Sequence, residues 1–286
     1  MRTYTISAFA DEAGSALDAQ LAALKRNGIS HIEMRMVDGK NASNLTADEA
    51  VAVRAKLSAA GVSLSALGSP FGKIRADEPF EPHFAQFKHA LMLCKLLGAT
   101  RMRIFSFYIP EGADPADFRS EVIARMDKML CAAEEWGIRL LHENEKGIYG
   151  DIASRCKDLL DHFGGRLGCI FDPANFIQCG EQPLDNFALL KDKIEYMHIK
   201  DALLADGSVV PSGKGDGNVP SILKDMPGCG DMILSLEPHL TVFSGLETLQ
   251  DESLKHVYTY PDSDTAFDAA ASALRGILTD LNQQWK

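Results

Sequence analysis

Short apolar runs alternate with longer amphipathic segments along the chain. Eight of the runs have the length of β-strands, and a three- or four-residue apolar repeat typical of a helix follows each one. The predicted strands are residues 4–9, 31–35, 62–67, 101–105, 139–143, 167–172, 194–200 and 232–237. Glycines end several of the helical patterns, among them Gly28, Gly61, Gly98 and Gly137. The pattern is therefore strand then helix, repeated over the length of the chain.

This repetition predicts an α/β fold with a parallel sheet, because strands joined through helices pair in parallel by right-handed crossovers. Eight units within 286 residues favour a (β/α)8 TIM barrel over an open doubly wound sheet. An open nucleotide-binding sheet carries a glycine-rich loop after its first strand, and Phe9-Ala10-Asp11-Glu12 is not such a loop. No change in composition marks a boundary, so residues 1–286 are predicted to form a single domain.

Four successive predicted strands end at residues that bind metals, namely Glu143, Asp172, His198 and Glu237. The carboxyl ends of barrel strands meet over one mouth, so these side chains are expected to converge. One such residue at a strand end is usually structural. Four together would repel one another or lose solvation without a counter-charge. The sequence therefore predicts a metal site at this end of the barrel.

The residue types narrow the choice of ion. Three carboxylates and one imidazole, without cysteine, form an oxygen-rich site for one divalent ion. Mn²⁺ is the preferred ion in this interpretation, and Co²⁺, Mg²⁺ and Zn²⁺ are alternatives. Four protein ligands leave about two positions on a six-coordinate ion. Two adjacent sugar oxygens, a hydroxyl and a carbonyl, could take them, so a small carbohydrate is the expected partner.

Charge and hydropathy exclude other classes of partner. The net charge is −11 and the pI is about 5.2, which argues against binding nucleic acid. No apolar run is long enough to span a membrane, and no signal peptide is recognisable, so a cytoplasmic protein without a membrane partner is predicted. The six cysteines lack a Cys-x-x-Cys spacing and are interpreted as thiols. A homo-oligomer is compatible with these features.

Short motifs at the strand ends point to a family. They are Glu143-Asn144, Phe171-Asp172-Pro173, His198-Ile199-Lys200-Asp201, Gly215-Asp216-Gly217 and Leu236-Glu237-Pro238-His239. In their order and positions the chain resembles the sugar phosphate isomerase/epimerase family, in the xylose-isomerase-like TIM barrel superfamily that also contains endonuclease-IV-like proteins. The resemblance implies one metal held by Glu143, Asp172, His198 and Glu237. It also implies that Glu143 and Glu237 are acid/base groups on opposite faces of the substrate.

The expected reaction is isomerisation or epimerisation of a small sugar or sugar derivative. A metal-bound carbonyl acidifies the adjacent C–H, and an enediolate forms when a carboxylate removes the proton. Two departures from family epimerases weigh against ketose C3-epimerisation: Asn175 stands where they have histidine, and Leu204 where they have arginine. Lys200 instead resembles the pattern of inosose dehydratase. A dehydratase or decarboxylase of a keto-polyol or keto-sugar acid is therefore the alternative.

Two further alternatives belong to other classes. A nuclease like endonuclease IV would need several more histidines in the site and is less expected. A metal-free binding protein could use the same barrel.

Five residues near the predicted mouth are candidates for contact with substrate: Lys200, Asn175, Lys73, Glu145 and His239. Lys200 could instead pair with Asp201 or Glu237, and Lys73 could be solvated. Glu33 could meet a sugar hydroxyl or support the site, and the sequence does not decide whether Arg103 faces the barrel interior. His142 is predicted to point away from Glu143, towards the helices.

Overall fold

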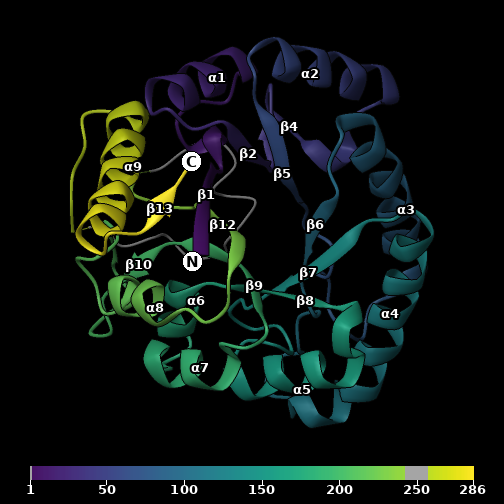
Figure 1. Cartoon of the computed structure of the whole chain (residues 1–286). Helices are drawn as coiled ribbons and strands as arrows, with labels where there is room; N and C mark the ends of the chain where they lie inside the picture. The colour runs from purple at the N-terminus through teal and green to yellow at the C-terminus, as the bar shows by residue number, and fades with distance from the viewer. Residues whose placement is uncertain (1, 242–256) are drawn as a thin grey trace.

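A curled parallel sheet surrounded by helices forms the protein in the computed structural model, which describes residues 2–241 and 257–286 (Figure 1). The nine strands follow the order β13-β1-β12-β9-β8-β7-β6-β5-β2. Their bounds are β1 Arg2–Ala8, β2 His31–Met34, β5 Ser63–Gly68, β6 Arg101–Ile104, β7 Arg139–Glu143, β8 Gly168–Phe171, β9 Ile194–Ile199, β12 Gly230–Leu236 and β13 Gln284–Trp285. The predicted TIM-barrel architecture is confirmed.

Helices cover the outside of the sheet, as Figure 1 shows. They are α1 Leu17–Arg26, α2 Ala47–Ala59, α3 Phe80–Leu97, α4 Pro115–Glu135, α5 Ala153–Phe163, α6 Pro173–Gln178, α7 Pro183–Leu190, α8 Val219–Asp225 and α9 Ser263–Asp280. Local chemistry sets their ends. Thr46 and Glu49 form a capping box at the start of α2, and Gly98 ends α3 in the left-handed conformation with φ of 85°.

Side chains on each strand point alternately outwards and into the barrel, so there are two hydrophobic cores. Residues facing outward pack against the helices in the large core, and a small cluster within the barrel contains Ala66, Leu141, Ile170 and Tyr196. Side chains repeat with period two on a strand, so Glu143 lies on the same face of β7 as Leu141. The polar residues at the strand ends therefore rest on an apolar layer inside the barrel.

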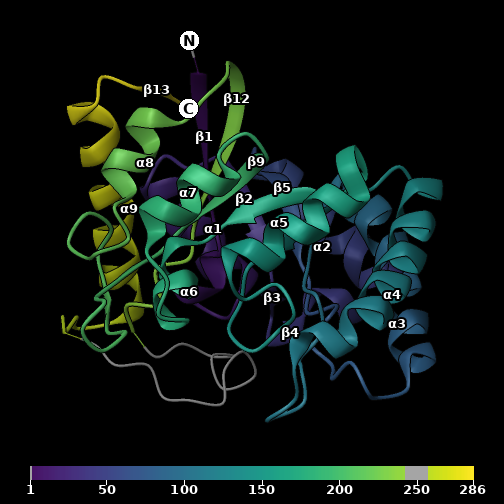
Figure 2. The same ribbon diagram turned by 90° about the horizontal axis from the view of Figure 1, so that it is seen from below.

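Short elements that the pattern missed lie mainly at the mouth. They include the β3–β4 hairpin (Met36–Val37 and Lys40–Asn41) and the helix α6, which Figure 2 places at the end of the barrel opposite the N-terminus. β13 is also missed, because two residues are too short for periodicity; it pairs with β1 at Thr3 and Tyr4.

The loop after β9 is bonded to the strand that precedes it. The Asp201 carboxylate accepts hydrogen bonds from the backbone N–H groups of Gly213, Gly215 and Gly217 at 2.8, 3.1 and 2.8 Å. A side chain at Gly215 would collide with this carboxylate, which explains the glycine. The Asp201 carboxylate therefore binds the backbone of the loop and does not pair with Lys200.

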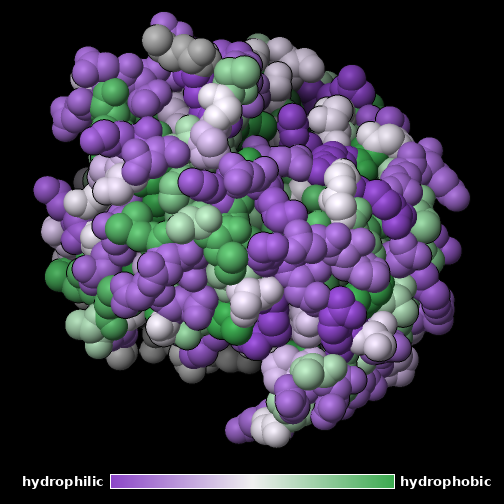
Figure 3. All heavy atoms as spheres, turned by 60° about the horizontal axis from the view of Figure 1, so that its bottom comes forward, coloured by the Kyte–Doolittle hydropathy of each residue, from purple (hydrophilic) through white to green (hydrophobic). Residues whose placement is uncertain are grey.

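The surface is mixed in character. Figure 3 shows a face that is mostly hydrophilic, with an apolar area between the polar side chains. Among the described residues, no helix combines the length and hydropathy that a membrane span requires.

Candidate metal and sugar site

The four predicted ligand residues come together at the carboxyl ends of their strands. Glu143 ends β7, Asp172 follows β8, His198 lies in β9 and Glu237 follows β12. Each offers one ligand atom, and these atoms lie within 4.8 Å of one another. All four residues are buried, with at most 4% of the residue surface exposed. The convergence expected from the sequence is therefore present.

The donor set can be tested against a divalent ion. Glu143 Oε2, Asp172 Oδ2 and Glu237 Oε2 are buried and have no hydrogen-bond partner. Each lies near a basic group, but not in hydrogen-bond geometry: Arg103 at 3.1 Å, Lys200 at 2.9 Å and His198 at 3.0 Å respectively. Carboxylate oxygens that are buried without a donor are costly, and a hard cation satisfies them. These residues therefore fit an oxygen-preferring metal.

His198 lies between carboxylates on both sides of its ring. Nδ1 is 2.7 Å from Glu143 Oε1 and 3.0 Å from Glu237 Oε2, and Nε2 is 3.1 Å from Glu33 Oε2. Burial by itself would lower the pKa of His198, but the carboxylates outweigh it and raise the pKa well above the usual value. The pKa of Asp172 is also raised. Burial raises it to about 6, although the positive charge of Lys200 favours the ionised carboxylate.

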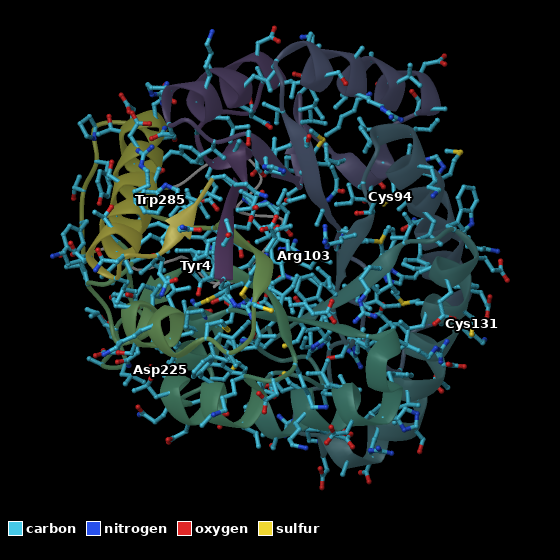
Figure 4. All side chains as sticks on the ribbon, in the orientation of Figure 1. Tyr4, Cys94, Arg103, Cys131, Asp225 and Trp285 are labelled. Carbon is cyan, nitrogen blue, oxygen red and sulfur yellow. The ribbon has the colours of Figure 1, made fainter. Side chains whose placement is uncertain are left out.

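Two arginines, Arg35 and Arg103, accompany the acidic cluster. Arg103 faces the interior, near the middle of the ring in Figure 4, and lies 3.1 Å from Glu143 and 3.6 Å from Glu237. The Arg35 guanidinium lies 3.0 Å from Glu237 and 2.9 Å from Asp11. The Phe9 ring lies against both, at 4.5 Å from the Arg35 Cζ and 5.0 Å from the Arg103 Cζ. Both candidate acid/base glutamates are therefore held by buried guanidinium groups.

The acidic turn after β1 belongs to this network. Burial raises the pKa of Glu12 to about 8, although Arg35 at 3.4 Å opposes the shift. Glu12 accepts the backbone N–H of His239 at 2.7 Å, and the His239 ring lies 3.5 Å from Glu237. Burial, with Lys200 nearby, lowers the pKa of His239 to about 4.

Sequence reasoning did not assign Asp11, Glu12 or Arg35 to the site. One signal was available for Arg35. It follows Glu33 by two residues, and side chains two apart on a strand lie on the same face.

The predicted substrate residues lie in or beside the cluster. Lys200 pairs with Asp172 at 2.9 Å and approaches Glu237 at 3.8 Å; the predicted alternative pairing with Asp201 is wrong, because the loop glycines use that carboxylate. Asn175 Nδ2 donates to Asn144 O at 2.9 Å and to Glu143 Oε1 at 3.4 Å. Lys73 pairs with Glu145 at 2.8 Å, each side chain being 12% exposed. Contact of these residues with a substrate stays a prediction.

Two other histidines have structural partners. His142 bonds Ser106 at 3.0 Å, and burial lowers its pKa to about 3. His83 Nε2 accepts the backbone N–H of Gly72 at 2.9 Å, in a partly buried position between Phe71 and Phe80. The expectation that His142 points away from the acidic cluster agrees with its partner.

Residues 21–260 match the family model described as xylose isomerase-like TIM barrel, and the chain belongs to this family. A curated relative is the probable L-ribulose-5-phosphate 3-epimerase UlaE of Mycoplasma pneumoniae, which is 24% identical over 139 residues. That alignment covers 48% of this chain and 46% of the relative, so the chain matches about half the length of this relative.

Solved structures extend the likeness in fold to nearly the whole chain. The IOLI protein with a binding zinc atom has a TM-score of 0.73 and 16% identity, with 98% of this chain and 99% of that chain covered. The probable 3-DHS dehydratase AsbF of Bacillus anthracis has a TM-score of 0.70 and 16% identity, with 96% and 99% covered. At these identities the likeness establishes the fold.

Proposed function

We propose that the chain is a divalent-metal-dependent enzyme that isomerises or epimerises a small sugar or sugar derivative. The observation that carries the proposal is the buried cluster of Glu143, Asp172, His198 and Glu237, with ligand atoms within 4.8 Å of one another. Family membership and the epimerase named among the relatives support it. Mn²⁺ is the proposed ion.

The four residues would hold the ion, which would polarise the sugar carbonyl and make the adjacent C–H more acidic. Glu143 and Glu237 are then the groups that remove the proton and return it. A carboxylate has two oxygen atoms, so each glutamate could hold the ion through one of them and accept the proton on the other. Arg103 and Arg35 orient these carboxylates through ion pairs.

The charge balance of the site favours an uncharged sugar over a sugar phosphate. Four basic side chains at or near the mouth each pair with a carboxylate, in the pairs Arg35–Asp11, Arg103–Glu143, Lys200–Asp172 and Lys73–Glu145. A phosphate would have to compete with these carboxylates for the basic groups. Polyhydroxy ketones, linear or cyclic, are therefore the proposed substrate class.

Elimination at the same site is the second candidate. Lys200 places an ammonium group 2.9 Å from Asp172, where it could protonate a departing hydroxyl of a keto-polyol or keto-sugar acid. The dehydratase named among the structures of similar fold is compatible with this chemistry.

A sugar screen in D₂O separates the candidates. The Mn²⁺-loaded protein is incubated with free ketoses, inososes and phosphorylated ketoses, and the products are followed by NMR. Solvent deuterium in the recovered sugar supports isomerisation or epimerisation, and loss of water or CO₂ supports elimination. Glu143→Gln and Glu237→Gln should abolish exchange, whereas the exposed control Glu135→Gln should not. Failure to bind metal, with no exchange or elimination across the panel, would refute the proposal.

A further inference from the structure

A chain of polar groups runs through the barrel interior beneath the acidic cluster. The Tyr196 hydroxyl donates to Glu33 Oε2 at 2.6 Å, and the same oxygen lies 3.1 Å from His198 Nε2. Tyr196, Glu33 and His198 are each 0% exposed. Tyr196 and His198 come from β9, whereas Glu33 comes from β2 on another part of the barrel wall. The contact therefore joins distant segments of the sequence at one buried point.

Further hydroxyl groups hold the Tyr196 side chain. Ser65 Oγ lies 3.0 Å from the Tyr196 hydroxyl and 2.7 Å from Ser7 Oγ. The Tyr196 ring packs in the interior cluster with Ala66, Leu141 and Ile170. Because packing holds the Tyr196 ring and Ser65 contacts its hydroxyl, the hydroxyl donor has a fixed position. Its hydrogen bond therefore fixes the Glu33 carboxylate.

The chemistry of Glu33 assigns the proton on the His198 ring. An ionised carboxylate only accepts hydrogen bonds, so Nε2 must carry the proton in the contact with Glu33. The other nitrogen, Nδ1, is directed at Glu143 and Glu237, the residues with which His198 would share the ion. Metal-binding histidines commonly donate their second ring N–H to a carboxylate, which fixes both ring orientation and tautomer.

We propose that Glu33, held by Tyr196, is a positioning residue that fixes the His198 ring with Nε2–H towards Glu33 and Nδ1 towards Glu143 and Glu237, where a bound ion would take the place of the Nδ1 proton. This inference rests on the metal site of the proposed function. It adds that the orientation of one ligand, His198, is set by a residue from another strand of the barrel, β2.

The test measures metal binding rather than turnover. Metal-depleted wild type, Glu33→Gln and Tyr196→Phe are titrated with Mn²⁺ by calorimetry and with Co²⁺ by absorption. Loss of such a carboxylate partner weakens metal affinity by about 10–100-fold, and a change in the visible Co²⁺ spectrum is expected with it. Tyr196→Phe should weaken binding in the same direction, because it removes the donor that holds Glu33.

Tyr149→Phe is the matched control. Tyr149 is also a buried tyrosine that donates to a carboxylate, Asp158, at 2.8 Å, but it lies outside the metal cluster. The control should lower thermal stability without changing metal affinity or the Co²⁺ spectrum, which separates positioning from a general loss of packing.

A measurement on the wild type covers the case in which a variant does not fold. Nitrogen-15 chemical shifts of the histidine rings should assign the Nε2–H tautomer to His198 in the protein loaded with Zn²⁺, a diamagnetic ion that does not broaden the signals of its ligands. The Nδ1–H tautomer, or wild-type metal affinity in both variants, would overturn the inference and leave the proposed function standing. Absence of metal binding in the wild type would overturn both.

Discussion

The Arg35 guanidinium bonds Glu237 at 3.0 Å, across 202 positions of sequence, and both side chains are at most 5% exposed. The same guanidinium also bonds Asp11 and approaches Glu12. Burial by itself would lower the pKa of Arg35, but these carboxylates outweigh it and raise the pKa above the ordinary arginine value. One guanidinium group thus contacts three acidic residues at the centre of the site.

Replacing Arg35 with methionine should therefore be strongly destabilising. Removal of one partner of a buried ion pair leaves uncompensated charge and costs about 3–5 kcal/mol. Urea unfolding measures this loss in the free energy of unfolding. Arg26→Met is the matched control, because Arg26 pairs with Asp264 and Asp268 at the surface, where the loss should stay below about 1 kcal/mol. Equal losses in the two variants would contradict this account of the network.

Metal removal should lower the melting temperature. A ligand that binds only the folded state at 100 times its Kd adds about 2.7 kcal/mol of stability. In a chain of 286 residues that corresponds to a fall of about 4–5 °C on chelation, which Mn²⁺ should reverse. Differential scanning calorimetry measures the change.

Asp172→Asn is the control for this experiment. The Asp172 side chain accepts the Asn175 backbone N–H at the start of α6, and asparagine keeps that cap while removing the charged ligand. A melting temperature in this variant that still responds fully to Mn²⁺ would place the ion elsewhere.

Gly68→Ala should displace the Phe9 ring, which packs against His198. A Cβ at Gly68 would lie 2.5 Å from Phe9 Cε1, and the Phe9 ring contacts the His198 ring edge-on at a centroid distance of 5.3 Å. Overpacking of this kind costs about 1–3 kcal/mol and should also weaken metal binding. Gly276→Ala, in α9 with nothing within 4 Å of the new Cβ, should instead be neutral or stabilising. Unfolding and metal titration of the pair provide the comparison.

Protonation of His83 should destabilise the protein as the pH falls. Burial lowers the folded-state pKa of His83 to about 4 from 6.5, and its Nε2 must stay unprotonated to accept the Gly72 N–H. Between pH 6.5 and 4 the unfolded chain therefore binds more protons at this residue, so stability decreases on acidification. Discounted for partial exposure, the loss is about 1–2 kcal/mol. Unfolding of His83→Gln across this range should lack that part of the pH slope; an unchanged slope would contradict the assignment.

The strand–helix order and the four clustered residues could be predicted from the sequence alone. Both depend on local features: alternation with period two or 3.6 defines each element, and the residue at the end of a strand follows from its position. The predicted strand over residues 139–143 agrees with β7, Arg139–Glu143. The barrel rule then placed Glu143 and Glu237 at one mouth.

Only the tertiary structure decided which acid each buried base pairs with. Lys200 selects Asp172 rather than Asp201, and Arg35 joins the turn after β1 to Glu237. The contact of Glu33 with His198 likewise spans 165 positions. Such pairings depend on how strands distant in sequence are placed around the closed barrel, and periodicity within a strand holds no information about its partner across the interior.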